Sequence, residues 1–136
     1  KNEDLKKLII ILKEKSIKNV TLPVSAPFHC SLMDSATKKM TEELNKLSFK
    51  NSSNKIISNV TAEEISDEKN LKELLIKQIE NRVRWRESIL NMIKNDVNHF
   101  IEIGPGKVLS GLIKRINREV KIDTINNQTD IENLSI

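Results

Sequence analysis

The sequence predicts an α/β fold in which short parallel strands are covered by helices. The first observation is length: 136 residues, 38% of them apolar and 31% charged, suit one modest globular domain. The second is order: from residue 55 onward, short apolar runs alternate with longer amphipathic ones. Because parallel strands need a crossover between them, usually a helix, this alternation favours a parallel sheet with helices packed on it.

The first third of the chain predicts two helices separated by an extended segment. Apolar residues at helical spacing predict a helix over residues 3–15. Val20, Leu22 and Val24 alternate as in a strand, and Pro23 favours an edge position. After His29 a second helix is predicted. Its apolar face comprises Met33, Ala36, Met40, Leu44 and Leu47.

The remaining elements follow in order. Residues 55–60 are predicted to form a short buried strand, and Ser66 or Asp67 to cap the next helix. Strands are predicted at 99–103 and 120–125, with a Gly-Pro-Gly turn at 104–106 and a polar tail after the last strand. Helices between them have apolar faces made of Leu71, Leu74, Leu75 and Ile79, then Ile89, Met92 and Ile93, then Val108, Leu109, Leu112, Ile113 and Ile116.

Composition excludes several classes of function. The net charge is +4, but Lys and Glu are interleaved, and three Phe, one Trp and no Tyr provide few stacking surfaces, so no nucleic-acid partner is expected. The apolar run 8–12 is too short and too Lys-flanked to span a bilayer, and no signal-peptide cleavage site follows it. A single cysteine, Cys30, fits a reducing compartment, and a cytoplasmic location is predicted. Because the first residue is Lys1 rather than Met, the chain is expected to be a piece of something longer.

His29 is the first candidate for chemistry, because it lies where an extended run turns into a helix. Open α/β sheets place their reactive groups at the carboxyl ends of strands, and an imidazole can act as base and then acid near neutral pH. The alternative is a capping or core histidine, and position alone favours that reading.

The chain offers His29 no obvious nucleophile or metal. Neighbouring residues in a corner rarely point at each other, so Cys30 is predicted to be an inert buried thiol. The motif G-x-S-x-G is absent, and Ser110 falls inside a predicted helix as a small packing residue. His29 and His99 are 70 residues apart without a cysteine pair or H-E-x-x-H, so no metal site is predicted.

Three other features have a structural and a functional interpretation. The stretch EIGPGKVLSGL could hold an anion at a helix start, but a structural turn is the better interpretation. Gln78 lies near an apolar face and should find a hydrogen-bond partner. Arg82, Arg84 and Arg86 form either an exposed basic ribbon or an anion contact.

Four stretches, LPVSAPFHCSLM, IISNV, LLIKQIENRVRW and FIEIGPGKVLSGLIKRI, resemble in order and spacing the C-terminal part of malonyl-CoA:acyl-carrier-protein transacylases. The resemblance covers nearly the whole chain. It implies the C-terminal part of an α/β-hydrolase-like acyltransferase domain, preceded by the tail of a ferredoxin-like subdomain. Residues 1–24 would end the ferredoxin-like small subdomain, and residues 25–136 would belong to the large subdomain.

The resemblance also implies a chemistry, namely malonyl transfer from coenzyme A to acyl carrier protein in fatty acid synthesis. The family histidine that corresponds to His29 deprotonates a serine nucleophile and reprotonates the departing thiolate. A backbone carbonyl at the position of Gln78 orients its ring. Phe28, directly before the histidine, is a candidate for selectivity toward malonyl over methyl-branched groups. Malonyl-CoA and acyl carrier protein are the implied partners, with coenzyme A as substrate and product and no metal or bound cofactor.

The family's G-H-S-x-G motif, malonyl-binding arginine and oxyanion hole lie in its N-terminal part, which these residues do not match. The chain alone is therefore expected to be inactive, to need an N-terminal half, and to be marginally stable or self-associating. Two alternatives are a non-enzymatic module that binds the acidic carrier protein and a truncated-gene remnant without function.

Overall fold

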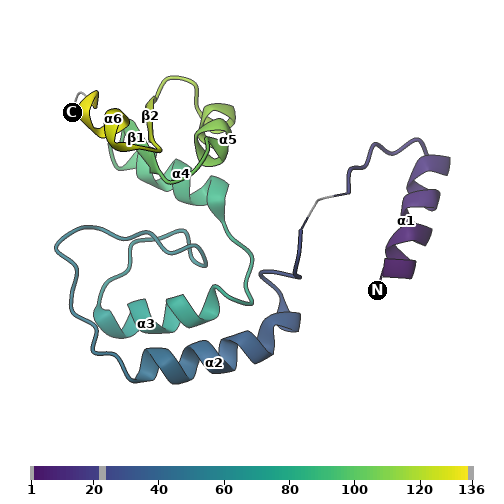
Figure 1. Cartoon of the computed structure of the whole chain (residues 1–136), viewed down its shortest axis with the longest axis horizontal. Helices are drawn as coiled ribbons and strands as arrows, with labels where there is room; N and C mark the ends of the chain where they lie inside the picture. The colour runs from purple at the N-terminus through teal and green to yellow at the C-terminus, as the bar shows by residue number, and fades with distance from the viewer. Residues whose placement is uncertain (1, 22–23, 135–136) are drawn as a thin grey trace.

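The computed structural model describes residues 2–21 and 24–134 of the chain (Figure 1). In chain order its elements are α1 (Asn2–Glu14), the 3₁₀ turn η1 (Ser31–Met33), α2 (Asp34–Asn45), α3 (Glu68–Lys77), α4 (Trp85–Lys94), β1 (His99–Ile103), α5 (Val108–Ile116), β2 (Lys121–Ile125) and α6 (Gln128–Glu132). The α/β prediction is confirmed, since β1 and β2 are parallel neighbours joined through α5.

The sheet and two helices, α4 and α5, form one hydrophobic core. His99 pairs with Lys121 and Ile103 with Ile125 along the parallel ladder. The core consists of buried apolar side chains from α4, β1, α5 and the residue directly before β2: Ile89, Phe100, Ile113 and Val120. Half-buried residues such as Trp85 and Ile116 pack around it. The predicted inward face of α4 is thus observed. That of α5 is observed in part, since Ile113 and Ile116 face the core whereas Val108 is 71% and Leu109 42% exposed.

A second layer is formed by α2 and α3, which pack side by side and run in opposite directions (Figure 1). The carboxylate of Asp67 accepts a hydrogen bond of 2.8 Å from the N–H of Asn70, so Asp67 rather than Ser66 is the N-cap of α3. Because the two helices are antiparallel, the start of α2 and the end of α3 lie at the same end of the pair. That end carries the candidate site.

One strand prediction is wrong, and a second falls partly outside the described residues. Residues 55–60 form no strand, because only one isolated antiparallel bridge, between Ile57 and Glu64, is made there, and the chain turns at once. The hydroxyl of Ser58 accepts hydrogen bonds from the N–H groups of Val60 and Thr61, which closes that turn. The other segment is extended without strand pairing at Val20 and Val24, while Leu22 lies outside the described residues.

The predicted polar tail contains a short helix, α6. Asn127 and Asp130 form a reciprocal capping box, in which each side chain accepts a hydrogen bond from the other's backbone N–H. The capping residues of this one-turn helix after β2 therefore lie within the segment itself.

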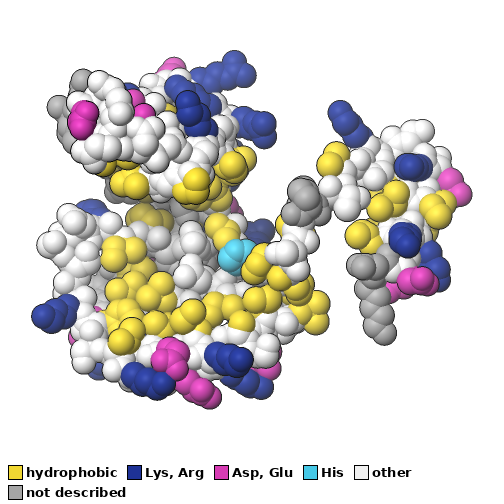
Figure 2. All heavy atoms as spheres, viewed as in Figure 1, with side chains coloured by type: hydrophobic (Ala, Val, Ile, Leu, Met, Phe, Trp, Pro, Cys, Tyr) yellow, Lys and Arg dark blue, Asp and Glu magenta, His cyan; other side chains and the backbone are white. Residues whose placement is uncertain are grey.

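Many large apolar side chains remain exposed. Figure 2 shows apolar side chains gathered in a band over α2 and α3. Leu32 and Phe28, close to His29 in the sequence, are also exposed. The strand residue Ile103 is 78% exposed. Helix α1 lies apart from the other elements (Figure 1), with much of its apolar surface exposed. Among the described residues, no helix has the length and apolarity that crossing a membrane would require.

Candidate active site

His29 projects from a tight turn directly before η1. The N–H of Phe28 bonds to the carbonyl of Ala26 at 2.9 Å, and the thiol of Cys30 donates to the carbonyl of Pro27 at 3.2 Å. Between them His29 has φ = 62°, the left-handed region that non-glycine residues rarely adopt. The residue itself is exposed. Strain of this kind is concentrated at functional sites.

The imidazole makes one defined hydrogen bond. Its Nδ1 lies 2.8 Å from the backbone carbonyl oxygen of Gln78, 49 residues away. A carbonyl oxygen only accepts, so Nδ1 carries the proton and Nε2 holds the free lone pair. No group in the described part of the chain bonds to Nε2. The ring is therefore held in the tautomer that a general base needs.

Gln78 supplies this carbonyl because it caps the C-terminus of α3. Its N–H closes the last helical turn by bonding to Leu74 at 3.0 Å, while its carbonyl lies beyond the helix and has no partner inside it. The imidazole satisfies that carbonyl. The His29–Gln78 contact that the family resemblance implies is thus present, although Gln78 ends the helix rather than lying on its face.

The side chain of Gln78 also has a partner. Its Oε1 accepts a hydrogen bond of 3.0 Å from Nδ2 of Asn59, so the predicted partner for this amide exists. Sequence reasoning did not find Asn59. The available signal was the adjacent polar pair Ser58 and Asn59 in a predicted buried strand, which a strand assignment leaves unexplained.

Phe28 lies next to His29 and is 57% exposed, so its ring is available at the site's surface. Cys30 is half-buried and its thiol is engaged with Pro27, which agrees with an inert role. The structure thus places Phe28, His29 and Gln78 together.

The helix start after the Gly-Pro-Gly turn has no room for an external anion. The carboxylate of Glu102 accepts from the backbone N–H groups of Leu109 and Ser110 and from the Ser110 hydroxyl at 2.5 Å, while Gly106 N–H donates to Asn126. The three hydrogen bonds that Glu102 accepts, of which the one from the Ser110 hydroxyl has the largest effect, lower the pKa of Glu102 below its usual range. The structural interpretation of this turn is confirmed, and Ser110 is a buried structural residue.

The second histidine, His99, makes a contact between the two strands of the sheet. Nε2 of His99 lies 2.6 Å from the carboxylate of Asp123 on the neighbouring strand. That hydrogen bond, together with the Lys121 ammonium, lowers the pKa of Asp123. In residues 2–21 and 24–134, no group of three His, Cys, Asp or Glu is arranged to hold a metal ion.

Arg84 and Arg82 have different surroundings. Arg84 is half-buried, with its guanidinium bonded to the carbonyl of Thr61 at 2.9 Å and its N–H to the carbonyl of Asn59 at 2.8 Å. Arg82 is exposed and lies 3.4 Å from Glu87. Arg84 therefore anchors the turn that carries Asn59, and its Nε lies 3.4 Å from the Glu87 carboxylate.

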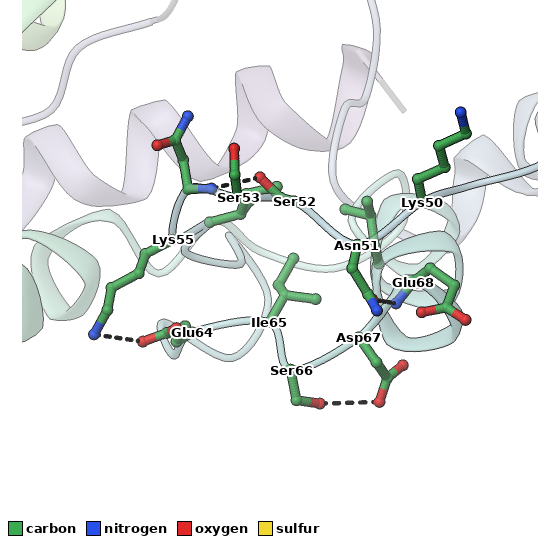
Figure 3. A pocket seen from close by; sticks show the side chains of 13 residues that line it. Lys50, Asn51, Ser52, Ser53, Lys55, Glu64, Ile65, Ser66, Asp67 and Glu68 are labelled. Atoms are coloured by element: carbon green, nitrogen blue, oxygen red, sulfur yellow. Dashed lines mark hydrogen bonds and ion pairs between the residues drawn. The ribbon is translucent and has the colours of Figure 1, made fainter.

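A surface hollow of about 300 Å³ lies elsewhere, between the 50–55 segment and the start of α3 (Figure 3). Its polar groups are bonded to one another: Lys55 pairs with Glu64 at 3.1 Å, and the Asn51 side chain accepts from the N–H of Glu68 at 3.2 Å. None of its lining residues belongs to the His29 site. It is a structural depression of the loop.

Comparison with known proteins gives a consistent result. No family model matches the chain. The malonyl CoA-acyl carrier protein transacylase of Bacillus subtilis is 42% identical over 123 residues, which is 90% of this chain and 39% of that protein. The crystal structure of the Clostridium perfringens transacylase superposes with a TM-score of 0.83 at 40% identity, covering 94% of this chain and 40% of that one.

A further solved structure is a malonyl-transacylase in complex with its type II PKS acyl-carrier protein, with a TM-score of 0.83 at 29% identity, covering 96% of this chain and 42% of that one. The chain thus spans about two fifths of the length of the relatives it matches. Sequence and structure together show that this chain is related, over most of its length, to the C-terminal part of the malonyl CoA-acyl carrier protein transacylases.

Proposed function

We propose that the chain provides the acid–base part of a malonyl-transfer site, with His29 as the catalytic base and acid. The observation that carries the proposal is the hydrogen bond of 2.8 Å between Nδ1 of the exposed His29 ring and the Gln78 carbonyl. It leaves Nε2 as the proton acceptor. In this proposal the nucleophilic serine lies outside these 136 residues, so the chain alone is inactive.

The proposed reaction passes one proton through Nε2 in each of two steps. As the serine oxygen attacks the malonyl thioester carbon, Nε2 accepts the hydroxyl proton, and it returns that proton to the coenzyme A thiolate as the C–S bond breaks. In the second step Nε2 takes the proton of the carrier protein's thiol, whose sulfur attacks the malonyl-serine ester. The proton then goes to the departing serine oxygen.

Gln78 and Phe28 have supporting roles in this proposal. The Gln78 carbonyl bonds Nδ1–H and keeps the ring in one tautomer and one orientation through both steps. The exposed Phe28 ring lies beside the histidine, where it would crowd a methyl branch on the acyl group. Discrimination by a single methyl amounts to about 1–3 kcal/mol.

The same proposal assigns residues 1–24 to the end of a ferredoxin-like small subdomain and residues 25–136 to the large acyltransferase subdomain. The separation of α1 from the other elements in Figure 1 supports that division.

The test uses a chimera in which this chain replaces the matching part of the Bacillus subtilis transacylase. Transfer of malonyl from malonyl-CoA to holo-acyl carrier protein is followed by mass spectrometry. We expect His29→Ala to lower kcat by roughly 10³-fold or more. His99→Gln, which changes the histidine that serves the sheet, is the matched control and should stay within roughly 3-fold of the parent.

Near-normal transfer by the His29→Ala chimera would refute the catalytic role. The isolated chain should show no transfer above the uncatalysed background. Turnover by the isolated chain would instead show that it contains its own nucleophile.

A second candidate is a carrier-protein-binding module without catalysis. The net charge of +4 favours it, and so does the related transacylase solved with its carrier protein, because acyl carrier proteins are acidic. Salt-sensitive binding of carrier protein to the isolated chain, with an inactive chimera, would support this candidate over the first.

A further inference from the structure

We propose that Asn59 is a positioning residue for His29, acting through the side chain of Gln78. The proposal rests on the function proposed above. It adds a residue that touches neither substrate nor the reacting atoms, and that fixes the carbonyl on which the imidazole tautomer depends.

The two amides are joined in a sheltered place. Nδ2 of Asn59 donates to Oε1 of Gln78 over 3.0 Å, and both residues are half-buried. Both line a hollow of about 180 Å³ whose other walls are mainly apolar, among them Ile57, Leu74 and Leu75. A hydrogen bond in such surroundings is electrostatically stronger than one in water, and leaving one partner unpaired is costly.

Asn59 is itself held firmly. Its carbonyl accepts the N–H of Arg84 at 2.8 Å, and the Arg84 guanidinium bonds to Thr61 within the same turn. Asn91 in α4 donates to the carbonyl of Ala62 at 2.8 Å. The turn at 58–62 is thereby fixed to the start and middle of α4, which packs into the hydrophobic core.

Gln78 needs this support because it lies at a helix end. The final turn of a helix frays, and the Gln78 carbonyl lies past the last helical hydrogen bond, which its N–H makes to Leu74. The Asn59 amide ties the Gln78 side chain to the core, so the attached carbonyl keeps its direction toward Nδ1 of His29. Without the hydrogen bond from Asn59, the Gln78 carbonyl rotates more freely. The Nδ1–H tautomer of His29 then loses the acceptor that stabilises it.

The test reads the tautomer directly in the isolated chain. Proton–nitrogen correlation spectra of the imidazoles, recorded at about pH 8, distinguish Nδ1–H from Nε2–H. In the parent chain we expect His29 as the Nδ1–H form. Asn59→Leu and Gln78→Met both remove the amide pair and should shift His29 toward the Nε2–H form that free histidine prefers.

Conservative replacement and an internal reference separate positioning from general damage. Gln78→Glu keeps an oxygen acceptor for Asn59 and should retain the parent pattern at His29. His99, bonded to Asp123, should be unchanged in every variant. If Asn59→Leu unfolds the chain, shown by loss of the bonded His99 pattern, Gln78→Met tests the same bond from its other partner. An unchanged His29 tautomer in a folded Asn59→Leu or Gln78→Met chain would overturn the proposal.

The chimera supplies an independent readout. Because Asn59 does not touch substrate, Asn59→Leu should lower kcat by roughly 10- to 100-fold, the range for a slightly misplaced catalytic group, with KM for malonyl-CoA unchanged. A raised KM with normal kcat would contradict positioning. If His29→Ala transferred malonyl normally, the proposed function would fail, whereas the tautomer measurement would still decide whether Asn59 orients the ring.

Discussion

Replacing Ile89 by alanine tests where the stability of this chain resides. Ile89 is 0% exposed and belongs to the core with Phe100, Ile113 and Val120. The change deletes three carbon atoms, worth about 2.4 kcal/mol at ~0.8 kcal/mol each. A cavity term raises the expected cost to about 3–4 kcal/mol. The described residues include only five buried apolar side chains, so this loss should be a large part of the total stability.

Ile103→Ala is the matched control, since it removes the same atoms from a side chain that is 78% exposed. With about a fifth of the surface buried, its cost should be about 0.5 kcal/mol. Urea denaturation can be followed by the fluorescence of Trp85, the single tryptophan, which packs against the core. An Ile89→Ala cost below about 1 kcal/mol would refute this core assignment.

The Ile103 variant also reports on association. A cost equal to that of Ile89→Ala would mean that the exposed strand face is covered in solution. Midpoints that rise with protein concentration would then identify self-association as the cause.

Two further predictions concern backbone strain and pH. His29→Gly should be more stable to urea than His29→Ala by up to about 1 kcal/mol, because glycine adopts φ = 62° without the steric cost of a Cβ; equal stabilities would argue against a left-handed residue 29. The folded-state pKa of Glu102 is lowered, so its contribution is fully present above the unfolded value of about 4.3 and is lost as pH falls through the folded value. The urea midpoints of the parent and Glu102→Gln should therefore converge as the pH is lowered from 6 to 3, and a constant difference would contradict this linkage.

The elements that the sequence predicts correctly have a clear pattern in their own residues. Amphipathic spacing and the Asp67 cap predict α3, and the strand at 99–103 coincides with β1. The capping box of α6 is also visible in the sequence, since Asn127 and Asp130 have the required spacing, although a polar tail was predicted there.

The 55–60 prediction failed because a strand is defined by its partner. Ile56 and Ile57 are apolar and β-branched, as strand residues are, yet in the described chain only Glu64 pairs there, through a single bridge. Without a ladder, the Ser58 hydroxyl captures the following N–H groups and turns the chain. The composition of a segment indicates that it can form a strand, whereas strand pairing depends on residues that are far away in the sequence.

The candidate site could be predicted only in part for the same reason, because its contacts join residues that are far apart in the sequence. The corner position of His29 was visible, but its acceptor is 49 residues away, and only the family resemblance pointed to Gln78. Asn59 was invisible because its role requires a turn that the sequence did not predict. Spacing along one helix reveals a shared face, but it does not reveal which helix end meets which turn.

The use of a carbonyl rather than a carboxylate to orient His29 makes the site depend on helix packing. A carboxylate attracts an imidazolium over several ångströms by its full charge, whereas a carbonyl holds Nδ1–H only through a short, directed bond, here 2.8 Å. His29 precedes α2 and Gln78 ends α3, so the relative placement of these two antiparallel helices sets that distance (Figure 1). A small slide of α2 along α3 would break the bond without altering any residue of the site. The contacts between α2 and α3 and the anchored turn at 58–62 are therefore part of the geometry of the proposed catalytic site, and substitutions there should disturb the His29 tautomer while leaving Nε2 chemically intact.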